Sequence, residues 1–249
     1  MTMPEQRNHG LDLIKWLAIG TMVIDHLRYV SWLADLGLND YFTLIGRWAF
    51  PLFCVAIAAN MQRIIEMQRT ASFKRYLWQL GGFSLLSEIP YRMCVKDAQV
   101  INIMPTLFLG VLLLWLVTTP SKYHWLWLTL LCVLLLLMSP LFMYGALGVL
   151  LPTAFYFALL ATGRVRWFAL MGAAVVAALS NLQYYLPPLA NEAQLTIVSL
   201  GFALNAAIAV FVGDQLLKHD LKYPVLPVGA WGYWFYPTHF LVIFTLSSI

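Results

Sequence analysis

Apolar stretches long enough to cross a lipid bilayer follow one another along almost the whole chain. Only short polar connections separate them, so no soluble domain fits in between. In lipid, the backbone N–H and C=O groups of such a stretch must be satisfied within it, which favours α-helices. The sequence therefore predicts an all-α, polytopic membrane helix bundle that forms a single domain over residues 1–249. The expected segments are roughly 11–33, 42–61, 76–93, 101–118, 123–139, 143–161, 167–183, 194–216 and 228–248.

The number of spans is open by one in either direction. We expect about nine transmembrane helices, but segments 123–139 and 143–161 are divided only by Ser139-Pro140. They form either a hairpin or one broken helix, so eight to ten spans fit the sequence. The longest outer connection is expected at 181–194, where two prolines either end the flanking helices or stiffen an aromatic-lined lip that covers a site.

Composition excludes several classes of protein. The chain is 61% hydrophobic and 10% charged, whereas soluble domains carry about 25% charged residues. Its net charge of +4 is scattered between apolar segments and forms no basic face, so no nucleic-acid partner is expected. The three cysteines are far apart, and no Cys/His pair has the spacing of metal ligands, so no metal is expected.

Lys and Arg are unevenly distributed between the two sets of connections. With nine spans and a cytoplasmic N-terminus, eleven of the fifteen Lys and Arg fall on the cytoplasmic side. The exceptions are Arg28, Arg47, Arg92 and Lys96. We therefore expect a multi-pass protein of a bacterial inner membrane, with an uncleaved first helix and an outer C-terminus.

The first apolar segment carries the most informative polar residues. Asp25 and His26 stand side by side near its outer end, with Arg28 close behind. Ionisable groups in a membrane helix normally face a protein interior or a water-filled cavity, although a helix end among the lipid headgroups also tolerates them. A carboxylate beside an imidazole can fix its tautomer and raise its basicity, which favours a catalytic pair. Successive helical residues point about 100° apart, however, so Asp25 could instead pair with Arg47 in a structural role.

Polar groups on five segments fall at a similar depth. From the helical rise, His26 lies about 10 Å, Arg47 about 8 Å and His239 about 13 Å from the outer end. Glu88 and Asn102 lie near the same end, and prolines that bend membrane helices accompany these sites. We expect the five to meet in one polar cavity, with Glu88 and Asn102 binding the substrate. Each residue also has a purely structural alternative. His239 could simply bond a backbone carbonyl, and Arg47 could simply neutralise a buried acid.

One face of the first segment suggests a long ligand. Lys15, Ile19, Met22 and His26 follow helical spacing, so they share a face that extends about 16 Å from Lys15 to His26. A ligand whose anionic head meets Lys15 and whose reactive tip meets His26 would fit this face. Acyl-coenzyme A has that shape, although Lys15 could equally reach the lipid headgroups.

Three stretches resemble a known family. DLIKWLAIGTMVIDHLRYV, followed by GRWAFPLFCVAIAANMQR, resembles the paired signature of the TraX family, the F-pilin acetylases, and YWFYPTHFLVI resembles its C-terminal helix. Residues 110–225 are similar to the family only in apolar character. The family in turn resembles larger groups of membrane acyltransferases.

The resemblance implies an activity and a set of residues. Acetyl-CoA would be the donor, no metal would be needed, and the α-amine of a membrane-held pilin subunit would be the acceptor. The positions that carry over are Asp25, His26, Arg47, Pro51 and His239. His26 would be the general base, with Asp25 holding its ring and Arg47 stabilising the thioester oxygen or gripping the donor. Direct transfer and a covalent acetyl-histidine are both compatible with these residues.

Three functions from different classes therefore remain open. The first is an acetyltransferase acting on pilin during conjugation, or on a cell-surface glycan or lipid. The second is a proton-coupled transporter, because acids and histidines inside a helix bundle also suit a proton relay. The absence of a visible internal repeat argues against a transporter. The third is a non-catalytic assembly factor that holds another membrane protein.

Overall fold

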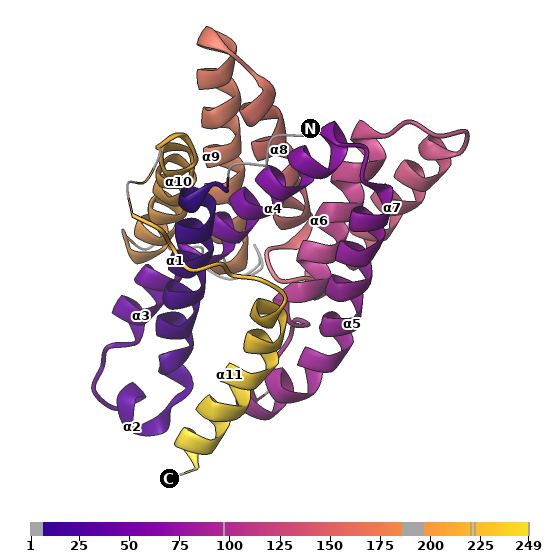
Figure 1. Ribbon diagram of the computed structural model, residues 1–249. Helices are drawn as coiled ribbons and strands as arrows, with labels where there is room; N and C mark the ends of the chain where they lie inside the picture. Colours follow the sequence, from indigo (N-terminus) through magenta and orange to yellow (C-terminus); the bar gives the residue numbers. More distant parts are fainter. Residues whose placement is uncertain (1–6, 97, 186–196, 220, 222, 249) are drawn as a thin grey trace.

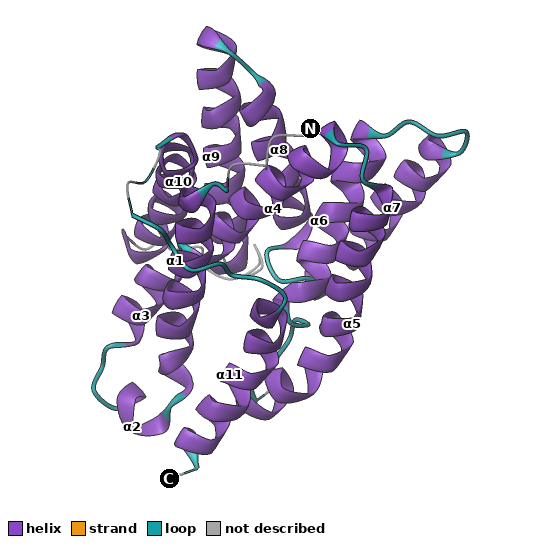
Figure 2. Cartoon of the chain, viewed as in Figure 1, coloured by secondary structure: helices purple, strands orange, loops and turns teal. Residues whose placement is uncertain are grey.

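A computed structural model describes residues 7–96, 98–185, 197–219, 221 and 223–248 of the protein. Within these residues the regular structure is helical apart from one isolated bridge between Ile101 and Phe142, so the all-α prediction is confirmed (Figure 2). The elements are α1 His9–His26, η1 Leu27–Tyr29, α2 Ser31–Ala34, α3 Asn39–Gly46, α4 Ala49–Glu66, α5 Thr70–Cys94, α6 Ile103–Thr118, α7 His124–Met138, η2 Ser139–Leu141, α8 Gly145–Leu160, α9 Gly163–Tyr185, α10 Ile197–Lys218 and α11 Trp231–Ser247.

Each expected apolar segment contains a helix, but the lengths differ from those of nine full spans. By length and composition, four helical stretches of the described chain could cross a bilayer: Asn39–Glu66, His124–Leu141, Gly163–Leu182 and Ser199–Lys218. The apolar helices α6 and α8 have only 16 residues each, and the charged residues of α1 lower its hydropathy. The apolar helices fit a membrane protein, while the count of nine stays a prediction.

The structure shows interruptions at two places in the expected segments. Segment 42–61 begins in α3 and continues in α4 after a turn at Arg47 and Trp48. Helices α7 and α8 are separate, because η2 and the left-handed residues Tyr144 (φ 64°) and Gly145 (φ 56°) lie between them. Such a break is expected for a hairpin and for a broken helix alike, so the range of eight to ten spans stays a prediction. Most of the expected outer loop at 181–194 lies outside the described residues.

Helix α4 is the centre of the bundle. It packs against α1, α5, α6, α8 and α10, and Leu52, Val55, Ala58 and Met61 along it are almost completely buried. Helix α7, by contrast, lies at one side of the bundle and exposes most of its apolar surface (Figure 1). Helix α4 thereby fixes the positions of α1, α5 and α6, whereas α11 packs against α5.

Helices α1 and α11 run toward the same end of the molecule and approach each other there (Figure 1). The start of α1 is capped by Asn8, whose side chain accepts from the Leu11 amide at 2.9 Å. Near their far ends, the Ser31 hydroxyl donates to the Ser247 carbonyl at 3.1 Å, and the Ser247 hydroxyl donates to the Tyr29 carbonyl at 2.5 Å. These bonds join η1 and α2, which follow α1 directly, to the end of α11. They hold α11 close to the end of α1, where His26 lies.

A buried acid joins α9 to α10. Asp214 of α10 is only 1% exposed and forms ion pairs with Arg166 of α9 and, one turn along α10, with Lys218. A buried carboxylate is stable only when it is paired, so this triad fixes how the two helices pack.

Replacing Asp214 should weaken this packing. Asp214→Asn keeps the shape but leaves the Arg166 charge without its counterion. Because the two cations are partly exposed, we expect a loss of roughly 2 kcal/mol of unfolding free energy, seen as a fall of about 4–8 °C in the melting temperature of the detergent-solubilised protein. Asp35→Asn, at an exposed aspartate, is the matched control and should change nothing measurable. Equal melting temperatures for the two variants would contradict this role of Asp214.

Candidate active site

Two histidines from opposite ends of the sequence meet at the end of α1. Nδ1 of His26, the last residue of α1, lies 2.7 Å from Nε2 of His239 in α11. The Phe240 ring lies 4.6 Å from the His26 ring, and the Phe235 ring stacks on His239 at 5.6 Å between centroids. The expectation that the first and last segments bring their histidines to one level agrees with this geometry.

The hydrogen bonds fix which ring nitrogen carries each proton. Nδ1 of His239 lies 3.1 Å from the Phe235 carbonyl oxygen, which can only accept, so this nitrogen donates. In neutral His239, Nε2 is then the acceptor, and Nδ1 of His26 must donate to it. This leaves Nε2 of His26 as the unprotonated nitrogen, the form that a general base needs.

Asp25 is engaged mainly by arginines rather than by His26. Its Oδ1 accepts from Nη2 of Arg47 at 3.0 Å and lies 3.2 Å from Nη1 of Arg28. Its Oδ2 is 3.9 Å from Nε2 of His26, too far for a hydrogen bond. The expected orientation of the His26 ring by Asp25 is therefore replaced by the alternative, an Asp25–Arg47 pair, and His239 orients the ring. At 3.9 Å the carboxylate still stabilises a positive charge on His26.

Arg47 is almost completely enclosed, with 2% of its surface exposed. Besides Asp25, its guanidinium donates to the Thr43 carbonyl at 3.1 Å and to the Tyr144 hydroxyl at 3.2 Å. These contacts indicate that Arg47 positions Asp25 rather than contacting a donor molecule directly. Arg28, which is more exposed, also donates to the Thr43 hydroxyl at 3.0 Å. Two guanidinium groups thus face one carboxylate, and the cluster has a surplus of positive charge.

Gly46 permits the close approach of Asp25 and Arg47. A Cβ atom at Gly46 would lie 2.3 Å from the Asp25 Cβ atom, closer than any real contact. Gly46 ends α3, and Arg47 follows it directly. A residue without a side chain is therefore required for α1 and α3 to pack at this level.

Glu88 and Asn102 bind each other beside the histidines. Oε2 of Glu88 accepts from the Asn102 side chain at 2.7 Å and from its backbone amide at 3.0 Å, while Asn102 caps α6. The next amide, of Ile103, donates to the Tyr236 hydroxyl at 3.3 Å, and the Tyr236 ring lies 5.5 Å from His239. The pair joins α5 to α6 next to the candidate site, and its role in substrate binding stays a prediction.

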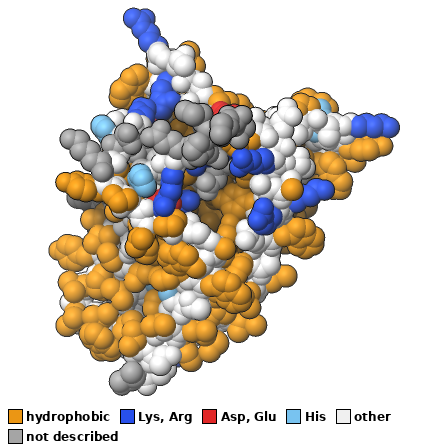
Figure 3. Space-filling view, in the orientation of Figure 1, with side chains coloured by type: hydrophobic (Ala, Val, Ile, Leu, Met, Phe, Trp, Pro, Cys, Tyr) orange, Lys and Arg blue, Asp and Glu red, His pale blue; other side chains and the backbone are white. Residues whose placement is uncertain are grey.

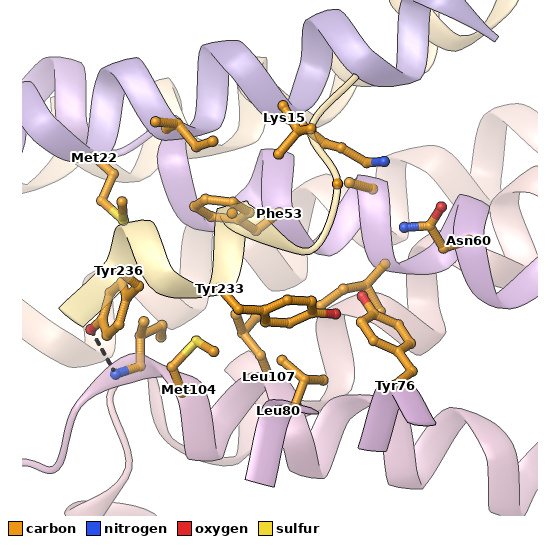
Figure 4. A pocket seen from close by; sticks show the side chains of 17 residues that line it. Lys15, Met22, Phe53, Asn60, Tyr76, Leu80, Met104, Leu107, Tyr233 and Tyr236 are labelled. Atoms are coloured by element: carbon orange, nitrogen blue, oxygen red, sulfur yellow. Dashed lines mark hydrogen bonds between the residues drawn. The ribbon is translucent and has the colours of Figure 1, made fainter. Parts of the chain in front are cut away.

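A mostly apolar cavity of about 230 Å³ leads toward this cluster (Figure 4). Lys15, Ile19 and Met22 line it from α1, as the shared face predicted. Met22 and Tyr236 lie at one end, whereas Lys15 lies toward the other. His26 is one helical turn beyond Met22, about 6 Å along α1, so the cavity stops just before the histidine pair.

Some residues of the site were missed by sequence reasoning. Asp25 and Arg28 are three apart on consecutive helical turns, a spacing that could have identified Arg28 as a partner. Tyr144 gave no such signal, because it is 97 residues from Arg47. In the part of the chain that the structure describes, no group of three or more His, Cys, Asp or Glu side chains could hold a metal ion.

Comparison with known proteins supports the resemblance seen in the sequence. A family model described as TraX protein matches residues 10–247, nearly the whole chain. No curated protein and no solved structure matches the chain. The matched range includes every residue of the cluster around His26 and His239.

The close packing at Gly46 can be tested with one added methyl group. Gly46→Ala should push Asp25 away from Arg47 and destabilise the protein by about 1–3 kcal/mol. Gly20→Ala is the matched control, because a Cβ atom there would meet nothing within 4 Å. It should be neutral or slightly stabilising, because Ala favours the helix. Thermal unfolding in detergent measures both. Wild-type stability of Gly46→Ala would show that this contact is unimportant.

Proposed function

Because this chain belongs to the TraX family, whose members are associated with pilin and conjugation, we propose that it is a membrane-embedded acetyltransferase. The donor is acetyl-CoA, and the acceptor is an amine, namely the N-terminal amine of a membrane-held pilin subunit. The observation that carries the proposal is the His26–His239 pair, which supports an unprotonated Nε2 on His26 beside Asp25.

The first step is attack by the amine on the thioester. The amine nitrogen forms a bond to the acetyl carbonyl carbon, and Nε2 of His26 takes the proton that the nitrogen loses. His26 then carries a positive charge, which the Asp25 carboxylate at 3.9 Å stabilises. The hydrogen bond from Nδ1 to His239 keeps the ring in position throughout.

The second step is collapse of the tetrahedral intermediate. Its oxygen carries a negative charge, which the positive surplus of Arg28 and Arg47 favours. The carbon–sulfur bond then breaks, and the leaving thiolate takes the proton from His26. Coenzyme A and the N-acetylated acceptor are the products, and His26 returns to its starting form. If Nε2 attacked the thioester itself, an acetyl-histidine would precede transfer to the amine.

The proposed orientation places the donor in the cytoplasm. Lys and Arg side chains gather at the end of the molecule where α4 meets α5, while the other end is largely hydrophobic in the same view (Figure 3). By the positive-inside rule, the basic end faces the cytoplasm and the histidine pair lies toward the outer surface. Donor and acceptor then approach the histidines from opposite sides of a nine-span bundle.

His26 should be essential for acetyl transfer. His26→Ala and His26→Gln both remove the base, so the rate of acetylation should fall by a factor of about 10² to 10⁴. His239→Ala should reduce the rate less, because it removes only the partner that orients the ring. The measurement is the transfer of label from radiolabelled acetyl-CoA in membranes with equal amounts of each variant, followed by identification of the labelled component.

A histidine outside the cluster provides the control. His124→Ala, at the start of α7, should retain full activity. Wild-type labelling by His26→Ala would remove His26 from the chemistry. Label in a lipid or glycan, but not in pilin, would keep the transfer reaction and change the acceptor.

The orientation gives a separate prediction. A reporter that is active only outside the cytoplasm should be active when fused after Ile249, because nine spans and a cytoplasmic N-terminus place the C-terminus outside. A reporter that is active only in the cytoplasm should be inactive at the same position. The reverse pattern would require an even number of spans.

A further inference from the structure

A second cavity, of about 380 Å³, adjoins the first on the basic side. Arg63 comes from α4, Arg69 from the turn after it, and Arg75 from the first turns of α5. The remaining lining residues are Asn60, Ile64, Ser72, Tyr76, Gln79 and Tyr233. Three arginines therefore line a pocket whose described wall includes no Asp or Glu.

The two cavities share part of their walls. Asn60, Tyr76 and Tyr233 line both of them. These three side chains lie together at the end of the apolar cavity that is farther from Met22 and Tyr236 (Figure 4). A ligand that occupies both spaces would have a polar, anionic end among the arginines and a slender apolar arm that points toward the histidine pair.

Lys15 is a weaker candidate for binding the anionic end. It lies on the wall of the apolar cavity, and its amine is 3.8 Å from Asp12, which partly neutralises it. Guanidinium groups bind phosphate oxygens in bidentate fashion, whereas an ammonium group acts as a point charge, and three guanidinium groups suit a ligand with several phosphates. We therefore assign the anionic head to the arginine pocket instead of Lys15, and Lys15 would lie beside the apolar arm of the ligand.

Basic residues at helix ends also bind lipid headgroups, and this is the competing explanation. A lipid would be expected to contact arginines spread along the membrane boundary. Here the three line one pocket, and that pocket shares wall residues with a cavity lined by α1, α4, α5, α6 and α11. The ligand chemistry shared by both explanations is a phosphate group, and the joined cavity favours a nucleotide.

We propose that Arg63, Arg69 and Arg75 form the binding site for the phosphorylated nucleotide end of the acyl donor, and that the apolar cavity holds its pantetheine arm. This inference rests on the proposed acetyl transfer, because it identifies where that reaction's donor binds. The thioester at the tip of the arm then lies at the Met22 end, one turn from His26.

Binding can be measured without any turnover. The purified protein in a neutral detergent is titrated with coenzyme A and, separately, with adenosine 3′,5′-bisphosphate, which represents the nucleotide end alone. Arg63→Gln and Arg75→Gln should each weaken the binding of both compounds about 10-fold to 100-fold, because each removes charge-assisted hydrogen bonds. Arg164→Gln, an exposed arginine that lines neither cavity, is the matched control and should bind both as wild type does.

A catalytic variant separates this inference from the proposed function. His26→Ala should bind coenzyme A normally while failing to transfer acetyl groups. If Arg63→Gln and Arg75→Gln bind coenzyme A like wild type, the arginine site is wrong, even where labelled acetyl transfer succeeds. If wild-type protein binds no coenzyme A and transfers no label, both proposals fail.

Vesicles test the lipid explanation directly. Anionic vesicles of phosphatidylglycerol and neutral vesicles of phosphatidylcholine are offered to the same variants. Loss of anionic-vesicle binding in Arg63→Gln and Arg75→Gln, with coenzyme A binding unchanged, would assign the arginines to lipid and overturn the inference. Loss of coenzyme A binding, with vesicle binding unchanged, is the expected result.

Discussion

The ion pair between Asp25 and Arg47 organises the candidate site. An unpaired carboxylate buried between membrane helices would be very costly, so Asp25 requires a cation at this level. Arg47 provides it from the turn between α3 and α4 and also binds Tyr144, which precedes α8. One guanidinium thereby connects α1 to two other parts of the bundle. Because His26 follows Asp25 directly, the same ion pair sets the position of the proposed base.

This arrangement divides the work of the polar groups. Asp25 is occupied by two arginines and lies too far from His26 to bind it, so His239 holds the imidazole ring. The Phe235 carbonyl in turn fixes the proton on His239. The series of hydrogen bonds from His26 through His239 thus ends at a neutral carbonyl. The His26 ring is therefore oriented without a second negative charge in the membrane interior. The Asp25 carboxylate then remains to stabilise the charge that His26 would gain in the proposed transfer.

The sequence predicted the depth of the polar residues better than it predicted which of them bind each other. Helical rise placed His26, Arg47 and His239 at one level, and they do lie there together. Depth says nothing about direction around the bundle, so the bond between the two histidines could not be predicted. The spacing of Lys15 and Met22 identified a cavity wall correctly because both lie on one helix. The arginine pocket was missed, since the positive-inside rule counts its residues without showing that they converge.

The shape of the joined cavities constrains how the two substrates would meet. The basic pocket is lined by three arginines, whereas the passage beyond Tyr76 and Tyr233 is mostly apolar. Transferring several phosphate charges through such a passage would be very costly, so the head of a donor must stay on the basic side. Only its arm can advance toward His26. In the proposed transfer, the acceptor amine would then reach the histidine pair from the other side, where η1 and α2 are bonded to the end of α11.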